Sequence, residues 1–451
     1  MNARTRRVSV IGLGYVGLCT AATFASKGFR VIGIDVDDKK IDLISKGSVP
    51  VHEPGLDRLI SSAAKRRRLW VGTDVSRVVE TDVTFLTVGT PSRNDGSIDL
   101  AFVMKATEVL GGALREKDSY HLAVVKSTVT PGTTNGIVKR ILEKSSGKTV
   151  GPKLGLAANP EFLKEGTAII DALHPDKIII GTNDRKSATH LTTLYKDFYG
   201  TRLPPLIVTN PETAELVKYA SNAFLATKVS FINTIANIAQ QIPGVDVGQV
   251  AEALGHDPRI GPLFLKAGPG YGGSCFHKDL QALIKFGQDN GYDPILMQAT
   301  EKTNEEQANR IEELSERLVG PLNQKRIAVL GLAFKKDTDD IREAASLRVI
   351  DRLLKKGAKV VAYDPIAIPN AKMVLADTIE FADDAYAALK GADCCIVMTE
   401  WDEFKKLRPA DYRTHMKTPN VVDARRLYRP EEFETINFLA TGYGAEVKFK
   451  G

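Results

Sequence analysis

Short runs rich in β-branched and small apolar residues alternate with helix-like stretches along roughly the first 180 residues. The runs are VSVIG, VIGID, TFLTVG, AVVKST, LGLAAN and KIIIG. Near-continuous apolar strands are typical of sheets buried on both faces, and strands that alternate with helices form parallel sheets. The pattern therefore predicts an α/β fold, in which a doubly wound parallel sheet is covered by helices.

The same pattern returns near the C-terminus. The segment 325–334, KRIAVLGLAF, is followed by KKGAKVVAYDP, DCCIVMTE and NVVDAR. KRIAVLGLAF and KKGAKVVAYDP correspond to RRVSVIGLG and SKGFRVIGIDVD at the start of the chain, which predicts two related Rossmann-like halves.

The two halves are separated by a long stretch with few helix breakers. Residues 210–241 contain no glycine, and their only proline stands at the second position, which predicts one long connecting helix. Apolar and small residues lie on most of its faces, so we expect it to be buried between domains or between subunits. The expected domains are 1–208, 209–320 and 321–451.

Composition narrows the function classes. The chain has 451 residues, and its 61 basic and 55 acidic residues leave a formal charge of +6, which suits anionic small molecules and is no nucleic-acid signature. The four cysteines lack C-x-x-C spacing and the seven histidines are scattered, so we expect a reducing, cytoplasmic setting and no metal site. No apolar signal core or span of ~20 apolar residues occurs, so no membrane partner is expected.

A glycine-rich stretch, GLGYVG, stands between the first predicted strand and a helical stretch. Gly12 would permit a tight turn, Gly14 would let the backbone approach a pyrophosphate, and Gly17 would let the helix pack on the strand. Asp35 ends the next strand, where a carboxylate can bind a ribose 2′-hydroxyl and repel a 2′-phosphate, which favours NAD over NADP. A merely structural turn is the alternative, but the strand, helix and acid in register favour dinucleotide binding. Gly331, in LGLAFKKD, lacks this fingerprint, so a nucleotide in the second half must bind differently.

Three polar pairs share a spacing of four residues, which places each pair on one helix face if its segment is helical. The pairs are Glu161 and Glu165 in NPEFLKEG, Lys218 and Asn222 in AELVKYASN, and Cys275 and Asp279 in GGSCFHKD. NPEF follows a predicted strand, as do Thr90 in VGTP and Thr128 in KSTV, and open α/β sheets bind ligands beyond their strand ends. Alone, the glutamates could form a solvated helix start, and the lysine could be buried or could snorkel to the helix edge.

Cys275 stands out among the cysteines. After flexible glycines and in the first turn of a helix, its thiolate would be stabilised by backbone N–H groups, with help from Lys278. Such a thiolate attacks carbonyl carbon, and Asp279 could order a water or take a proton. Cys275 could still be structural, whereas Cys19, Cys394 and Cys395 are expected to be packing cysteines.

The stretches GLGYVG, VGTP, KSTV, NPEFLKEG, AELVKYASNAFLATKVSFIN, GPGYGGSCFHKD and FKKDTDDIRE follow one another over nearly the whole chain. Together they resemble the UDP-glucose/GDP-mannose dehydrogenase family. The resemblance implies oxidation of a sugar C6 alcohol to a carboxylate with two NAD, with UDP-glucose as the expected substrate. It also implies that Cys275 forms a thiohemiacetal with the intermediate aldehyde and then a thioester, which is hydrolysed.

The resemblance assigns roles to the matching positions. Lys218 and Asn222 would bind the developing oxyanion, Asp279 with Thr128 would order a water, and Glu161 would be the base for thioester hydrolysis. The NAD site would consist of Gly12, Gly14, Tyr15, Val16, Gly17, Asp35, Lys40, Thr90, Thr128, Glu165, Lys278 and Arg342. The substrate would be held by Glu161, Phe162, Leu163, Lys164, Glu165, Lys218, Asn222, Arg259, Phe264, Leu265, Lys266, Ala267, Gly268, Gly272 and Lys335. Arg259 resembles a residue that reaches a neighbouring subunit's sugar site, which implies a homodimer built around the long helix.

Two positions depart from the family pattern. The residue after Phe276 is commonly proline, and here it is His277; its charged imidazole would favour the Cys275 anion. KSTV is usually followed by proline and a small residue, whereas this chain has Thr130 and Pro131. Neither departure removes a catalytic group. The open alternatives are the same reaction on GDP-mannose or a UDP-N-acetylhexosamine, and a non-catalytic nucleotide-sugar sensor.

Overall fold

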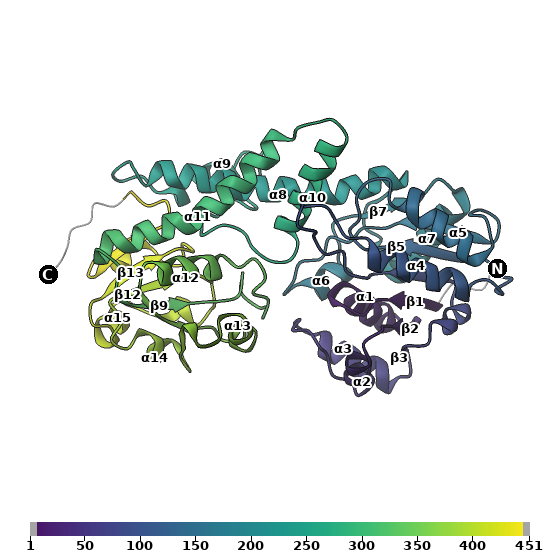
Figure 1. Cartoon of the computed structure of the whole chain (residues 1–451), viewed down its shortest axis with the longest axis horizontal. Coiled ribbons are helices and arrows are strands. Elements are labelled where there is room, and N and C mark those ends of the chain that lie inside the picture. The colour runs from purple at the N-terminus through teal and green to yellow at the C-terminus, as the bar shows by residue number, and fades with distance from the viewer. Residues whose placement is uncertain (1–6, 445–451) are drawn as a thin grey trace. The chain divides into compact units, whose positions relative to one another are not determined.

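The computed structural model describes residues 7–444, and this part of the chain forms two compact units (Figure 1). The first unit contains residues up to Ser221 together with Gln281–Phe286, and the second contains Asn222–Leu280 and the chain from Gly287 onward. Two helices, α8 (Pro211–Ala239) and α10 (Phe276–Asp289), contribute residues to both units. The single long helix predicted over residues 210–241 is thereby confirmed.

The first unit is built on an eight-stranded sheet in the order β3-β2-β1-β4-β5-β6-β7-β8. All neighbouring strands are parallel except β6 and β7, which pair antiparallel between Ala158 and Gly181, so the predicted parallel sheet is confirmed with one reversed contact. The strands are β1 (Arg7–Ile11), β2 (Arg30–Ile34), β3 (Leu69–Gly72), β4 (Val83–Leu86), β5 (His121–Val125), β6 (Leu154–Ala158), β7 (Ile178–Gly181) and β8 (Leu206–Thr209).

Helices cover both faces of this sheet because strand side chains alternate between its two faces. Val8 and Val10 pack with Leu18 of α1, Leu56 of α3 and neighbouring residues of α7, whereas Ile11 packs on the opposite face with α4 and α5. The helices of this unit are α1 (Tyr15–Ser26), α2 (Asp38–Ser45), α3 (Leu56–Lys65), α4 (Ala101–Ala113), α5 (Lys139–Ser146), α6 (Ala168–Leu173) and α7 (Arg185–Tyr199). Shorter helical turns are η1 (Val75–Glu80), η2 (Thr134–Val138) and η3 (Gly200–Arg202).

The second unit contains a six-stranded parallel sheet in the order β11-β10-β9-β12-β13-β14. Its strands are β9 (Arg326–Leu330), β10 (Lys359–Tyr363), β11 (Glu380–Phe381), β12 (Cys394–Val397), β13 (Asn420–Asp423) and β14 (Asn437–Ala440). Its helices are α9 (Val247–Gly255), α11 (Ile295–Val319), α12 (Ala345–Lys355), α13 (Ile368–Leu375), α14 (Ala385–Leu389) and α15 (Pro409–His415), with helical turns η4 (Ala376–Thr378), η5 (Phe404–Lys406) and η6 (Pro430–Phe433). The helix α11 packs on α12 and on this sheet, and together they enclose one apolar core.

The structure confirms that the two sheets begin in the same way. Gly12 follows β1 with φ of 94°, and Gly331 follows β9 with φ of 102°. Their N–H groups donate to Ile34 O and Tyr363 O, at the ends of the adjacent strands, both at 2.8 Å. Glycine is favoured at both positions because L side chains rarely adopt this conformation.

No helix within residues 7–444 is long and apolar enough to cross a membrane.

Candidate active site

The glycine-rich loop of the first unit has the geometry of a dinucleotide site. A Cβ on Gly12 would lie 2.8 Å from Val88 Cγ1, and a Cβ on Gly17 would lie 1.8 Å from Gly12 O, so both positions require glycine. A Cβ on Gly14 would meet no protein atom within 4 Å, which leaves space over the start of α1. A backbone turn with that space at a helix N-terminus suits a pyrophosphate, so the residues present fit the predicted NAD.

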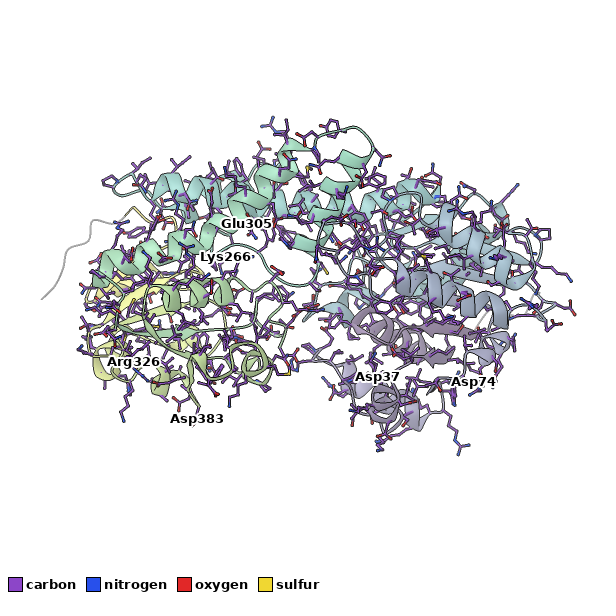
Figure 2. The ribbon with its side chains drawn as sticks, in the orientation of Figure 1. Asp37, Asp74, Lys266, Glu305, Arg326 and Asp383 are labelled. Atoms are coloured by element: carbon purple, nitrogen blue, oxygen red, sulfur yellow. The ribbon has the colours of Figure 1, made fainter. Side chains whose placement is uncertain are left out.

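Asp35 and Lys40 are brought together as predicted. The Lys40 Nζ lies 2.9 Å from Asp35 Oδ2, and the same oxygen accepts the N–H of Leu13 at 2.7 Å. The N–H of Asp37 donates to Asp35 Oδ1 at 3.1 Å. The side chain of Asp37, which is labelled in Figure 2, caps α2. Asp35 therefore fixes the glycine-rich loop as well as standing at the expected ribose position. Thr90 is buried beyond the end of β4.

Tyr15 and Val16 begin α1, and the Tyr15 side chain reaches a residue that sequence reasoning missed. Its hydroxyl donates to Glu53, whose Oε2 also accepts the N–H of Gly166 at 2.7 Å. Burial and Glu53 raise the pKa of the Tyr15 phenol. Glu53 thus ties the cofactor loop to the chain directly after Glu165. The available sequence signal was an acid next to proline and glycine in VHEPGL.

The NPEFLKEG stretch is not helical, so the prediction that Glu161 and Glu165 share a helix face is wrong. The carboxylate of Glu161 accepts the N–H of Leu163 at 2.6 Å, a local turn that replaces helical hydrogen bonding. The Asn159 side chain donates to Ile179 O at 2.7 Å and anchors the segment to β7. Glu165 lies half-buried in the turn that follows Phe162, Leu163 and Lys164.

Lys218 is buried and paired, which decides between the alternatives that the sequence left open. Its Nζ lies 3.1 Å from Glu161 Oε1, and the two side chains are only 5% and 9% exposed. Burial alone would raise the pKa of Glu161, but Lys218, the Leu163 N–H and Lys126 hold it below the usual value. An ionised carboxylate is therefore available beside the ammonium.

Lys126 and Glu215 are polar groups beside this pair that sequence reasoning did not single out. Lys126 follows β5 and donates to Asn159 Oδ1 at 3.1 Å; desolvation lowers its pKa to about 8. Lys126 and Glu161 line a cavity of about 120 Å³ in the first unit. Thr128, Glu215 and Lys218 line a second cavity of about 10 Å³. A lysine directly after an apolar strand was the signal for Lys126.

In the second unit, Cys275 directly precedes the first residue of α10, and Cys275 O accepts the Asp279 N–H at 2.8 Å. The thiol of Cys275 is exposed, as attack on a substrate requires. Cys19, Cys394 and Cys395 are buried, and burial raises the pKa of each of these thiols, that of Cys394 to about 12. The predicted contrast between one accessible cysteine and three packing cysteines agrees with the structure.

Asp279 joins two other predicted residues. Its Oδ2 accepts from Asn222 Nδ2 at 2.6 Å, and its Oδ1 lies 2.6 Å from Lys278 Nζ. Asp279 is 2% exposed and Asn222 is 7% exposed. Lys218 and Asn222 both lie on α8, four residues apart, so the prediction that their segment is helical is confirmed.

The chain before Cys275 packs tightly where its glycines stand. Gly268 N–H donates to Asn233 Oδ1 at 2.8 Å, and Leu265 and Ala267 are buried. A Cβ on Gly272 would lie 2.4 Å from Glu343 O, so the glycine lets this segment contact the chain that carries Lys335 and Arg342. Phe264, a predicted substrate residue in the same segment, has φ of 65°.

Two predicted arginines pair with nearby acids. Arg342 lies 2.6 Å from Asp340. Arg259 pairs with Asp257, and its side chain is 87% exposed.

Charged residues gather at the carboxyl ends of β12 and β13, where open α/β sheets bind ligands. Arg425 Nε lies 3.4 Å from Glu400 Oε2 and donates to Met398 O at 2.7 Å. The Arg425 NH2 group donates to Phe334 O, directly before Lys335, at 2.6 Å. Lys266 is exposed and is labelled in Figure 2. Arg425 and Glu400 were missed from sequence, although NVVDAR follows a strand as NPEF does.

Three domain profiles match the chain in order. They are the NAD binding domain, the central domain and the UDP binding domain of the UDP-glucose/GDP-mannose dehydrogenase family, over residues 6–199, 212–306 and 328–430. The chain belongs to this family. Membership confirms NAD as the cofactor and an NAD-dependent oxidoreductase as the enzyme class.

Individual members of the UDP-glucose/GDP-mannose dehydrogenase family resemble the chain over almost its full length. A UDP-glucose 6-dehydrogenase of Haloferax volcanii is 44% identical over 94% of this chain and 98% of its own. The solved UDP-glucose dehydrogenase of Pyrobaculum islandicum is 39% identical, with a TM-score of 0.90, over 98% of this chain and 100% of its own. The solved UDP-D-ManNAc dehydrogenase of Pyrococcus horikoshii is 28% identical, with a TM-score of 0.85, over 97% of this chain and 99% of its own.

Proposed function

We propose that this protein oxidises UDP-glucose to UDP-glucuronate with two NAD, through a covalent intermediate on Cys275. The observation that carries the covalent route is the exposed Cys275 thiol at the start of α10, in contrast to three buried cysteines. Identity of 44% to a UDP-glucose 6-dehydrogenase and of 39% to a UDP-glucose dehydrogenase supports the substrate. When bound, NAD accepts one hydride from the sugar C6 in each of the two oxidations.

The residues act in a defined order. The first oxidation removes a hydride and a proton from the C6 alcohol and gives an aldehyde. The Cys275 thiolate adds to the aldehyde carbon and the oxygen takes up a proton, and the resulting thiohemiacetal loses a second hydride and the hydroxyl proton to become a thioester. Water then adds to the thioester carbonyl and gives up a proton to the base, the C–S bond breaks, and a carboxylate and the Cys275 thiol are released. Four electrons leave the sugar in total.

The proposed catalytic roles are assigned from the charge and hydrogen-bonding groups of each side chain. The Lys218 ammonium and the Asn222 amide stabilise the oxyanions that form at C6, because charge on the reacting oxygen is best stabilised by donors in a buried setting. Glu161 is the base for thioester hydrolysis, and its ionised state beside Lys218 supports that role. Asp279 and Thr128 order the attacking water.

The binding sites are proposed for the positions that resemble the family's. NAD is held by Gly12, Gly14, Gly17, Asp35 and Lys40, together with Tyr15, Val16, Thr90, Thr128, Glu165, Lys278 and Arg342. The nucleotide sugar is held by the segments 161–165 and 264–268 and by Gly272 and Lys335, and Arg425 adds a cation at the carboxyl end of β13. The proposed division is an NAD domain at 1–208, a central region at 209–320 and a UDP domain at 321–451.

A UDP-N-acetylhexosamine is the second candidate substrate, supported by the 28% identity to the UDP-D-ManNAc dehydrogenase. GDP-mannose is the third candidate, because the family name includes it. A non-catalytic sensor is disfavoured because each proposed catalytic side chain is present.

We further propose that the protein is a cytoplasmic homodimer that binds neither nucleic acid nor a membrane. Phe224, Phe231 and Ile238 recur every seven residues on α8 and are 65%, 50% and 54% exposed. Such a stripe is stabilised when it is covered by a second copy. Arg259, with its exposed side chain, is the residue proposed to reach the partner's sugar site. Light scattering of the wild type and of Phe231→Asp tests the assembly, and a wild-type monomer would contradict it.

The decisive experiment counts NADH per UDP-glucose at limiting sugar and excess NAD. We expect the wild type to form two NADH per sugar. We expect Cys275→Ser to release UDP-glucuronate more slowly than the wild type. One NADH per sugar would mean that the reaction stops at the aldehyde. Two NADH and a normal rate in Cys275→Ser would contradict the covalent route.

A further inference from the structure

One buried carboxylate contacts the chain on both sides of Cys275. Glu301 lies on α11 and is 4% exposed. Its Oε2 accepts the hydroxyl of Tyr271, four residues before Cys275, at 3.1 Å. Its Oε1 is bound by Nδ1 of His277, two residues after Cys275. Both contacts lie within the second unit and flank Cys275 along the chain.

The two sides of this clamp are not held equally. Tyr271 has two further hydrogen bonds to α11, because its N–H donates to Asn304 Oδ1 at 2.7 Å and its carbonyl accepts from Asn304 Nδ2 at 3.1 Å. The first turn of α10, by contrast, reaches α11 through the side chain of His277, while Asp279 of the same turn is bound to Asn222 of α8. Loss of the His277 contact should therefore free the residues next to Cys275 from α11, while the chain before Cys275 keeps its bonds to Asn304 and Asp279 keeps its bond to α8.

The charges around His277 favour its protonated form. The hydrogen bond to Glu301 raises the pKa of His277, burial opposes this, Glu343 raises the pKa further, and Arg348 lowers it. Below the unfolded pKa of about 6.5 the ion pair is fully formed, and it is lost as the pH rises through the raised pKa of the folded protein. An imidazolium two residues from a thiol also stabilises the thiolate.

We propose that His277 and Glu301 form a positioning pair that holds the Cys275 turn and couples the reactivity of its thiolate to the protonation of His277. The effect on catalysis rests on the proposed covalent role of Cys275, but the effect on the thiol does not. His277 stands where the sequence departs from the common proline, which offers neither a side-chain donor nor a charge. The pair therefore depends on a position where this chain departs from the common family pattern.

The test measures the rate of Cys275 alkylation by iodoacetamide from pH 5.5 to 9.5, with the modified peptide identified by mass spectrometry. In His277→Asn and Glu301→Gln we expect alkylation to be about threefold to tenfold slower at pH 6.5, with the difference vanishing above about pH 9, because a nearby charge shifts a thiol pKa by up to about one unit. His277→Lys keeps a permanent charge and should restore the fast rate. The double variant should match either single variant.

A histidine far from Cys275 in the sequence provides the control. His415→Asn removes a histidine at the end of α15 and should leave the alkylation profile unchanged. A drop in melting temperature with an unchanged alkylation profile in both variants would show a merely structural contact and would overturn the proposal. Failure of the NADH count would reject the dehydrogenase route without changing the alkylation result, so the two failures can be told apart.

Discussion

The acid that directly follows the second strand of each Rossmann-like half is Asp35 in the first and Asp364 in the second, and their surroundings differ. Each accepts the N–H that follows the turn glycine, from Leu13 at 2.7 Å and from Leu332 at 2.8 Å. Asp35 is otherwise bound by Lys40 and by the N–H of Asp37. Asp364 has four further donors: the N–H groups of Ala333, Ile366 and Ala367 and the indole of Trp401.

The comparison shows that one turn can serve two purposes. In the second half, the Trp401 indole and four backbone N–H groups donate to the acid, so the role of Asp364 is structural. Aligning Gly12 with Gly331 places Ala333 and Lys336 where the first half has Gly14 and Gly17. The turn and the acid are thus common to the fold, and the second and third glycines distinguish the half that binds a dinucleotide.

The largest expected effect comes from Gly17→Ala. Its Cβ would lie 1.8 Å from Gly12 O, so the loop must move and NAD affinity should fall by about 100-fold or more, roughly 3 kcal/mol. Calorimetric titration with NAD measures the change. Lys336→Ala, at the aligned position of the second half, is the control and should leave NAD affinity unchanged. Equal losses in the two variants would contradict the assignment of the cofactor to the first half.

Asp364→Asn should mainly destabilise, whereas Asp35→Asn should mainly weaken NAD binding. The amide cannot accept from all five donors of Asp364, and leaving buried donors unpaired costs about 2–4 kcal/mol. Thermal unfolding and limited proteolysis of the second unit measure this loss. A normal melting temperature for Asp364→Asn, or equal stability losses in the two variants, would contradict the structural role.

A smaller, pH-dependent effect is expected at Glu215, which holds the loop after Thr128 through the N–H groups of Gly132 and Thr134 at 2.7 and 2.8 Å. Burial raises the pKa of Glu215 to about 7. The folded protein then binds a proton more tightly than the unfolded chain, so this residue's contribution to stability falls as the pH rises from about 4.5 to 7.

Glu215→Gln should remove that fall. The stability of the variant relative to the wild type should rise by an amount on the order of 2 kcal/mol between pH 4.5 and 7.5. Melting temperatures across this range provide the measurement. Glu108→Gln, which removes an exposed partner of Lys105 on α4, is the control and should show a flat difference. A flat difference for Glu215→Gln as well would reject the expected titration.

Both sheets were predictable where strands are buried on both faces. The six apolar runs of the first half became β1, β2, β4, β5, β6 and β7. The two strands that were missed, β3 and β8, are partly exposed edge strands, LWVG and LIVT, which are short and carry a weak pattern. The helical interpretation of NPEFLKEG failed because the Glu161 carboxylate makes a local turn, and spacing alone does not reveal that competition.

By itself, the sequence determined the local features: the glycine positions, the long α8 helix, the repeated α/β halves and the one cysteine that stands between a glycine-rich turn and a helix start. These depend on backbone conformation and hydrophobic periodicity, which neighbouring residues encode. Only the tertiary structure decided the partners of the buried charges: Lys218 with Glu161, Asp279 with Asn222, and Glu301 with Tyr271 and His277. Such pairs join segments distant in the chain, because a desolvated charge is stabilised by whichever groups the fold places beside it.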